Sequence, residues 1–134
     1  MKTLRQFTAI MVLATMCTGC AITGSYFQQE GGKVETSLVD PEFERYIVIE
    51  NTEWKRSRNT NQLTVNIRLR NISDKTLRVI YAWCWYDANN TMTEGSPFFE
   101  LKTPLEAGDA EEISLVALKA SSKKYSVMIT VPGY

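Results

Sequence analysis

The sequence contains no histidine, and its only cysteines are Cys17, Cys20 and Cys84. The lack of histidine removes the imidazole general base, the Ser–His and Cys–His nucleophile pairs and the commonest protein ligand of zinc. There is also no glycine-rich motif that could hold a phosphate. Lys and Arg together number 15, as do Asp and Glu, so no excess of positive charge attracts nucleic acid. These absences predict a protein that is not an enzyme, with no catalytic residue, metal site, cofactor or nucleic-acid partner.

The first twenty residues have the organisation of an export signal. Lys2 and Arg5 precede an apolar run over 7–16, which is shorter than the about 20 residues that a membrane-spanning helix needs. The small residue Gly19 then stands directly before Cys20. This arrangement resembles a bacterial lipoprotein signal. The resemblance implies a signal peptide over 1–19, cleavage before Cys20 and lipid on the Cys20 thiol; the alternative is a cleaved signal with an incidental cysteine.

The predicted anchor also indicates a location. In the lipoprotein class an Asp directly after the lipidated cysteine favours the inner membrane, and here that place is held by Ala21. The class resemblance therefore implies a bacterial outer-membrane protein that is held by lipid and has its domain in the periplasm. More than one acyl chain on Cys20 would make the anchor stable, whereas a single chain binds only marginally. Cys84 is then the only cysteine left free.

The segment 20–43 reads as a flexible, lipid-anchored tether. It contains the pair Gly31-Gly32 and several Gln and Ser residues, and it shows no clear apolar period. Val34–Val39 is either a short edge strand or a continuation of the tether, since Pro41 argues against a central strand. The predicted domain is 44–134.

The rest of the chain has the pattern of β-strands. Over 63–70 apolar and polar residues alternate strictly, which predicts a strand with one buried face. Further strands are expected within 46–49, 77–86, 97–101 and 127–131, and a polar loop over 55–61. The segment 106–119 fits a strand better than a helix because Ile113 and Val116 are β-branched. We therefore predict an all-β protein with an antiparallel, immunoglobulin-like (Ig-like) β-sandwich.

Part of the chain resembles a known family. The residues that carry the resemblance are the run 63–74, the aromatic run 81–87, and Leu105-Glu106-Ala107-Gly108 before a further apolar run. In these segments the chain is similar to the YcfL-like outer-membrane lipoproteins of Gram-negative bacteria, a family of unassigned biochemical function. Asn90, where such turns usually carry Gly, and Cys84, where a larger side chain is common, depart from that pattern. The resemblance implies a small Ig-like domain on a lipid anchor and no catalytic role.

Two groups of residues are candidates for an interaction surface. Alternation along 77–86 places Ile80, Ala82, Cys84 and Tyr86 on the face opposite Trp83 and Trp85. Because this second face is also apolar, we expect another segment, a partner protein or a second copy to cover it. The second group is basic and consists of Lys55, Arg56 and Arg58. These residues either lie in a solvated loop or bind an anionic partner.

The aromatic residues allow a second interpretation. Tyr81, Trp83 and Trp85 share a face with Leu77 and Val79, so we expect them in the core, although rings of this kind also stack on sugars. A glycan-binding or peptidoglycan-binding lipoprotein would instead use exposed aromatic residues, for which the candidates are Tyr26, Phe27, Phe98 and Phe99.

The main hypothesis is a non-enzymatic, periplasm-facing interaction module of the cell envelope that binds another envelope protein or itself. The alternatives are the glycan-binding lipoprotein and an assembly lipoprotein of a secretion or peptidoglycan-synthesis complex. The last of these depends on compartment and fold class alone.

We predict that Cys20→Ser abolishes incorporation of labelled palmitate and leaves an unprocessed precursor, because no other cysteine follows a small-residue site. Metabolic labelling followed by gel electrophoresis measures both effects. Cys17→Ser is the control and should be labelled normally. Normal labelling of the Cys20 variant would contradict the prediction.

Overall fold

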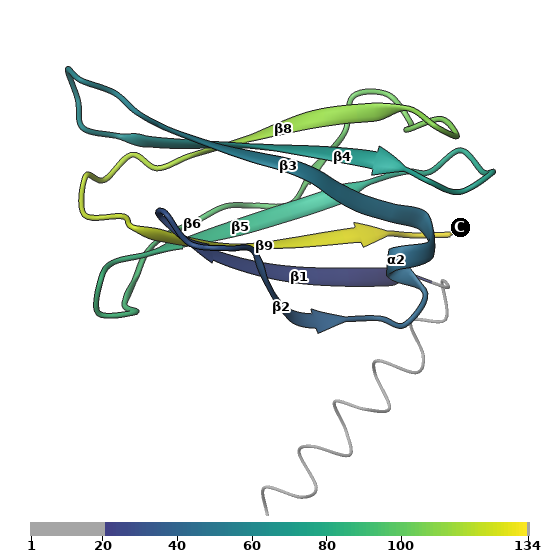
Figure 1. The fold of residues 1–134 in the computed structure, drawn as a ribbon, viewed down its shortest axis with the longest axis horizontal. Coiled ribbons are helices and arrows are strands. Elements are labelled where there is room, and N and C mark those ends of the chain that lie inside the picture. The colour runs from purple at the N-terminus through teal and green to yellow at the C-terminus, as the bar shows by residue number, and fades with distance from the viewer. Residues whose placement is uncertain (1–20, 134) are drawn as a thin grey trace, which may run out of the picture.

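The computed structural model describes residues 21–133 as two antiparallel β-sheets packed face to face (Figure 1). The predicted signal peptide over 1–19 and the predicted lipidation site Cys20 lie outside the described residues. This architecture confirms the all-β sandwich expected from the sequence. The elements in chain order are β1 (Ile22–Gln29), β2 (Glu35–Val39), α2 (Phe43–Tyr46), β3 (Ile47–Arg56), β4 (Leu63–Asn71), β5 (Ile80–Tyr86), β6 (Met92–Gly95), β7 (Phe99–Glu100), β8 (Ala110–Val116) and β9 (Lys124–Val131).

The larger sheet has the strand order β2-β1-β9-β5-β6, with β7 also paired to β5, and the smaller sheet has the order β3-β4-β8. At one end of the sandwich β1 begins, β9 ends and α2 connects the two sheets (Figure 1). We call this the α2 end. The opposite end carries the β1–β2 turn, the β3–β4 loop and the β8–β9 loop, and we call it the loop end. No helix within 21–133 is long and apolar enough to cross a membrane.

Strand β4 confirms the clearest sequence pattern. Leu63, Val65, Ile67 and Leu69 are buried, and the residues between them face away from the core. Burying an aliphatic side chain of this size stabilises the fold by roughly 1.5–3 kcal/mol relative to leaving it in water. Strand β8 adds the neighbouring buried row in the same sheet, and β9 of the larger sheet contributes a row that faces them across the core. The segment at 106–119 is thus a strand at Ala110–Val116, as the sequence favoured.

An aromatic group joins the two sheets. Trp54 from β3 lies against Trp85 from β5 and Tyr125 from β9, with ring centroids 6.3 and 5.5 Å away, and Trp85 lies 5.9 Å from Tyr125. Tilted and edge-to-face arrangements of this kind contribute about 0.5–1.5 kcal/mol per pair beyond the area they bury. The indole N–H groups of Trp54 and Trp85 are buried and find no acceptor among residues 21–133, which offsets part of that gain.

The prediction of a flexible tether over 20–43 is wrong for its described part. Strand β1 pairs with β9 along its whole length, from Ile22 opposite Val131 to Gln29 opposite Lys124, and with β2 on its other side. It therefore lies inside the larger sheet, and the folded domain begins at Ile22 instead of position 44. Of the two interpretations of Val34–Val39, the edge strand is correct, because β2 pairs only with β1 in the described chain.

The tether prediction failed because two of the inward positions of β1 are not apolar. Gly24 faces Phe43, and a Cβ at Gly24 would lie 2.8 Å from the Phe43 ring, so the position has no room for a side chain. Gln28 is buried, but its side-chain oxygen accepts a hydrogen bond from the Tyr125 hydroxyl and its side-chain nitrogen donates one to the Gly32 carbonyl oxygen. Both residues weaken the apolar period on which a strand prediction depends. Gly31 belongs to the β1–β2 turn, where its φ of 77° favours glycine.

Other boundaries differ by a few residues. Lys55 and Arg56, which we expected in a loop, belong to β3, and the loop that follows covers 57–62. Strand β5 begins at Ile80, because Leu77 makes only an isolated bridge with Leu105. The short α2 and β6 were not predicted.

The expectation that both tryptophans of β5 are buried is half correct. Trp85 is fully buried, whereas Trp83 is half-buried. The Trp83 ring stacks on Phe99 at 5.4 Å and on Tyr81 at 6.0 Å, near a hollow that the smaller sheet does not close. Burial along β5 therefore decreases away from the aromatic group.

We predict that Trp85→Ala lowers the free energy of unfolding by about 3–5 kcal/mol, because it empties the centre of the aromatic group. Chemical denaturation followed by circular dichroism measures this loss. Trp83→Ala, the matched control on the same strand, should cost clearly less because its ring is half-exposed. Equal losses would show that burial does not differ between the two rings.

Candidate functional site

The outer face of the larger sheet is one candidate surface, and it contains four of the predicted interaction residues. Ala82 of β5 lies beside Met128 of β9, which lies beside Ser25 of β1, so the three strands form one continuous surface. The central outward side chains carry no charge; they are Thr23, Ser25, Phe27, Ile80, Ala82, Cys84, Tyr86, Ser126, Met128 and Thr130. We call these ten residues the uncharged face. The sequence predicted only the part of it on β5. Charged groups border this face: Lys124 faces outward at the loop end, and Glu100, which pairs with Ile80, forms an ion pair with Arg78.

Cys84 lies within the uncharged face. Its neighbours in the sheet are Ser126 on β9 and Gly95 on β6, and the missing side chain of Gly95 leaves that flank of the sulfur open. The cysteine is half-buried, so part of its surface stays accessible in the described chain. The expectation that a partner or second copy covers it stays a prediction.

The outer face of the smaller sheet has a different chemistry. Glu50 accepts hydrogen bonds from Arg70 and Arg68, with the Arg68 Nε atom 3.0 Å from the carboxylate. These two guanidinium groups, Arg70 above all, lower the pKa of the Glu50 carboxyl group. Arg68 also lies opposite Glu112 in the pairing of β4 with β8. The two outer faces of the sandwich therefore differ: the smaller sheet carries charges at its centre, and the larger sheet carries them only at its border.

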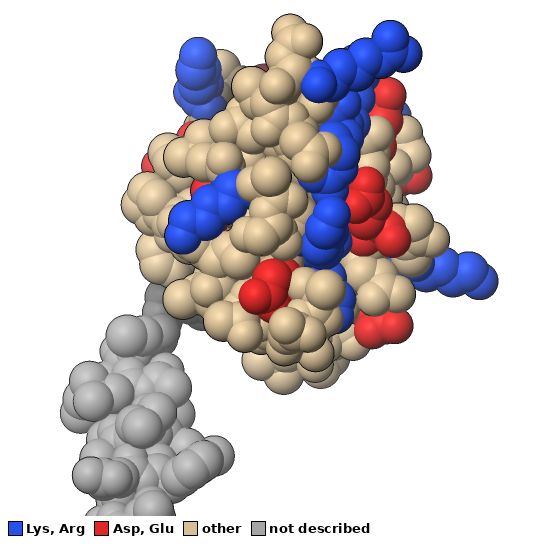
Figure 2. Space-filling view, turned by 90° about the vertical axis from the view of Figure 1, so that its left-hand side faces the viewer, with Lys and Arg blue, Asp and Glu red and all other residues tan. Residues whose placement is uncertain are grey.

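The basic residues Lys55, Arg56 and Arg58 lie at the loop end. Arg56 is not free there, because it forms an ion pair with Glu30 at 3.0 Å and donates a hydrogen bond to the Asn61 carbonyl oxygen. Folding brings further cations to this end from other loops, and Figure 2 shows Lys and Arg side chains in a band across it. The additional residues at these loops are Lys33, Lys119, Lys123 and Lys124.

The aromatic residues proposed for glycan binding do not form one site. Tyr26 is only 7 % exposed and Phe27 packs on Tyr86, so neither is the freely exposed ring that we expected. Phe98 and Phe99 are exposed at 63 and 42 %. Phe99, Trp83 and Tyr81 form a triangular cluster in which each ring contacts the other two: Trp83 is nearly parallel to Tyr81 and Phe99, at 17 and 18°, whereas Tyr81 and Phe99 are tilted by 33°.

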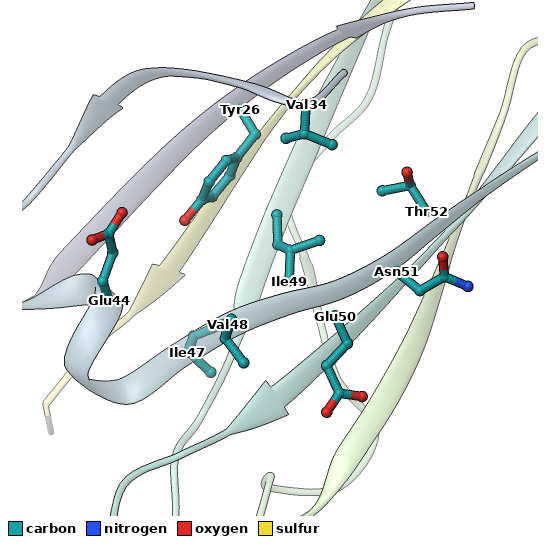
Figure 3. A pocket seen from close by; sticks show the side chains of 9 residues that line it. All are labelled: Tyr26, Val34, Glu44, Ile47, Val48, Ile49, Glu50, Asn51 and Thr52. Carbon is teal, nitrogen blue, oxygen red and sulfur yellow. The ribbon is translucent and has the colours of Figure 1, made fainter. Parts of the chain in front are cut away.

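A groove that sequence reasoning missed lies between the edge of β3 and the β1–β2 hairpin (Figure 3). It has a volume of about 600 Å³ and opens to solvent. The side chains of Val34 and Ile49 point toward one another across it, and Glu44 stands near its α2 end. The lining residues are Tyr26, Val34, Glu44, Ile47, Val48, Ile49, Glu50, Asn51 and Thr52.

Tyr26 is the most unusual residue of the groove. Tyr26 as a whole is only 7 % exposed, but its hydroxyl group is not among the buried unpaired polar atoms of the described chain, so it keeps contact with solvent at the groove. Burial, and secondarily the negative charge of Glu44, raise the pKa of Tyr26 to about 12. The hydroxyl is therefore neutral at physiological pH and can donate a hydrogen bond to a ligand.

The groove could not be found from the sequence because its walls are far apart in the chain. The sequence predicts a tether for the segment that carries Tyr26, and it leaves Val34–Val39 open between an edge strand and that tether. Strand β3 has a register shift between Ile49 and Asn51, which turns its edge at the groove, and nothing in the local pattern marks this bulge. Among residues 21–133, no group of three or more acidic or cysteine residues is arranged to hold a metal ion.

Two solved structures are similar in fold. One is Campylobacter jejuni Cj0090, with a TM-score of 0.50 and 18% identity over 60% of this chain and 82% of that one. The other is a DUF1425 family member from Shewanella sp. PV-4, with a TM-score of 0.54 and 16% identity over 71% of this chain and 86% of that one. No family model and no curated protein matches the sequence. The likeness supports an uncharacterised small β-domain fold of this kind.

We predict that the stability of the domain falls as the pH rises from about 10 to 12. An unfolded tyrosine ionises near pH 10, whereas burial raises the pKa of Tyr26 to about 12 and that of Tyr125 further. The folded state then binds more protons than the unfolded state, so stability that is complete below pH 10 is lost above it. Tyr26→Phe should make this fall shallower in urea denaturation across that range; an unchanged slope would contradict the assignment.

Proposed function

We propose that the chain is a non-enzymatic binding domain of the bacterial cell envelope, lipid-anchored through Cys20 to the outer membrane and facing the periplasm. In this proposal it docks through the uncharged face on another envelope protein. The observation that carries the proposal is the contrast between the centres of the two sheets: the ten central outward residues over three strands carry no charge, whereas ion pairs lie on the middle strand of the opposite sheet. In the larger sheet the charged groups Lys124, Arg78 and Glu100 stand only at the border of this face. Charge depletion is the compositional signal of an interface core.

The position of the predicted anchor supports this orientation. Only Ala21 separates Cys20 from β1, so lipid on Cys20 would hold the α2 end close to the membrane. The eight residues of β1 then extend about 26 Å away from the anchor at about 3.3 Å per residue. The uncharged face would stand at the side of the domain, where a neighbouring protein on the same membrane can reach it. Confinement to the membrane raises the effective concentration of such a partner.

The family assignment is part of the proposal. The sequence resemblance to the YcfL-like lipoproteins agrees with the structural similarity to a DUF1425 family member, and both concern small β-domains. Neither gives a partner or an activity. The proposal of a binding role depends on the two sheet surfaces alone.

We predict that a photoreactive residue at Ala82, in the uncharged face, crosslinks to another protein in membranes of the bacterium that produces the chain. The control position is Asn66, which points outward from the middle strand of the smaller sheet and is also half-buried. Immunoblotting should show a larger adduct at Ala82 and none at Asn66, and Met128→Glu should remove it because the charge lies beside Ala82. Mass spectrometry identifies the adduct.

Two outcomes would contradict this proposal. If the only adduct has twice the mass of the chain, the partner at this face is a second copy of the chain and not another envelope protein. The absence of any adduct at Ala82 would remove the uncharged face as a docking surface.

Glycan binding remains a second candidate because of one observation, the aromatic cluster of Tyr81, Trp83 and Phe99. It borders a hollow of about 390 Å³ that Glu111 and Glu112 also line. Sugar rings pack on exposed aromatic faces, and carboxylates accept hydrogen bonds from their hydroxyl groups. The crosslinking experiment separates the candidates, since a glycan gives no protein adduct at Ala82.

A further inference from the structure

We propose that the groove beside β3 binds an extended peptide segment of a partner protein, which adds a strand to the β3 edge and carries both apolar and basic side chains. This inference deepens the proposed binding role and rests on it, but it concerns a different surface from the uncharged face. Three features of the groove support it.

The first feature is the open edge of β3. This strand is ten residues long and pairs only with β4 in the described chain. In an antiparallel strand every second residue turns its N–H and C=O groups away from its partner, so half of the β3 backbone groups face the open side. Unpaired groups of this kind are a template for an added strand. A peptide in extended conformation supplies matching donors and acceptors, whereas a compact small molecule does not.

The second feature is the apolar floor beneath that edge. Val34 comes from the connection between β1 and β2, and Ile47 and Ile49 come from β3; all three line the groove, with Val34 facing Ile49 (Figure 3). A strand added to β3 would direct alternate side chains inward over these residues. The volume of about 600 Å³ is enough for more than one aliphatic side chain. The groove therefore selects a segment with apolar residues at alternate positions.

The third feature is polar and gives the sign of the ligand's charge. Glu44 forms no ion pair among the described residues, and it stands at the same end of the groove as the Tyr26 hydroxyl. Glu50 lies at the rim but is already shared by Arg68 and Arg70. A lysine or arginine on the peptide would pair with Glu44. A peptide carbonyl oxygen would accept a hydrogen bond from the Tyr26 hydroxyl, which lies at the groove.

The test uses the full chain in mild detergent and a short synthetic peptide of alternating valine and lysine, with an alternating valine–glutamate peptide as the charge control. We expect the lysine peptide to bind and the glutamate peptide not to bind. Isotope-edited NMR should place the largest amide shifts within Ile47–Thr52 of β3. Shifts concentrated on β6 or β8, or no binding of the lysine peptide, would overturn the proposal.

Matched variants test the side-chain contacts. Glu44→Gln should weaken binding by about fivefold and Tyr26→Phe by a similar factor, the loss expected for one hydrogen bond or ion pair of this kind. Glu112→Gln on β8 makes the same charge change, and Tyr86→Phe on the uncharged face removes the same hydroxyl; neither should alter binding. Equal effects of the groove variants and their controls would overturn the proposal.

Strand addition has a further signature in the peptide backbone. N-methylation of alternate backbone nitrogens blocks the edge hydrogen bonds in one register and leaves them intact in the other. One of the two methylated peptides should therefore lose binding while the other keeps it. If both bind as well as the parent peptide, no strand is added and the proposal fails. These measurements do not involve Ala82, so their failure is distinguishable from failure of the crosslinking at the uncharged face.

Discussion

The hydrogen bond from the Tyr125 hydroxyl to the Gln28 side-chain oxygen, at 2.8 Å, is the interaction on which much of the structure depends. It is fully buried and joins β1 to β9 in the larger sheet. The ring of Tyr125 also packs on Trp54 of the smaller sheet, so one side chain connects three strands and both layers. Without Gln28 the hydroxyl would be buried and unpaired, at a cost of about 1–3 kcal/mol.

The placement of β1 determines the shape of both candidate surfaces. Between β2 and β9 it completes the uncharged face on its outward side with Ser25 and Phe27. On its inward side it brings Tyr26 to the wall of the groove, while the contact of Gly24 with Phe43 holds α2 close. The same strand therefore links the predicted lipid anchor, the face and the groove. A domain built in this way has no long flexible segment between Ala21 and its sheet.

The two surfaces suit different modes of contact. The uncharged face is a broad sheet surface of small polar and apolar side chains, suited to flat packing against a folded partner. The groove is narrow, has a free strand edge and carries an unpaired acid, which suits an extended basic segment. The cations that gather at the loop end (Figure 2) lie opposite the α2 end and away from the groove residue Glu44 of α2.

The sequence by itself determined the fold class and the strands whose inward residues are all apolar. The strict alternation from Leu63 to Leu69 is an example, because a period of two leaves a single way to bury one face. It also gave Ile80, Ala82, Cys84 and Tyr86 a common face. Only the tertiary structure decided that β1 is a strand. The Phe43 ring of α2 fills the space beside Gly24, and the buried Gln28 side chain accepts a hydrogen bond from the Tyr125 hydroxyl, 97 residues away in the sequence. The groove likewise exists only where two distant segments meet, and local patterns carry no information about such contacts.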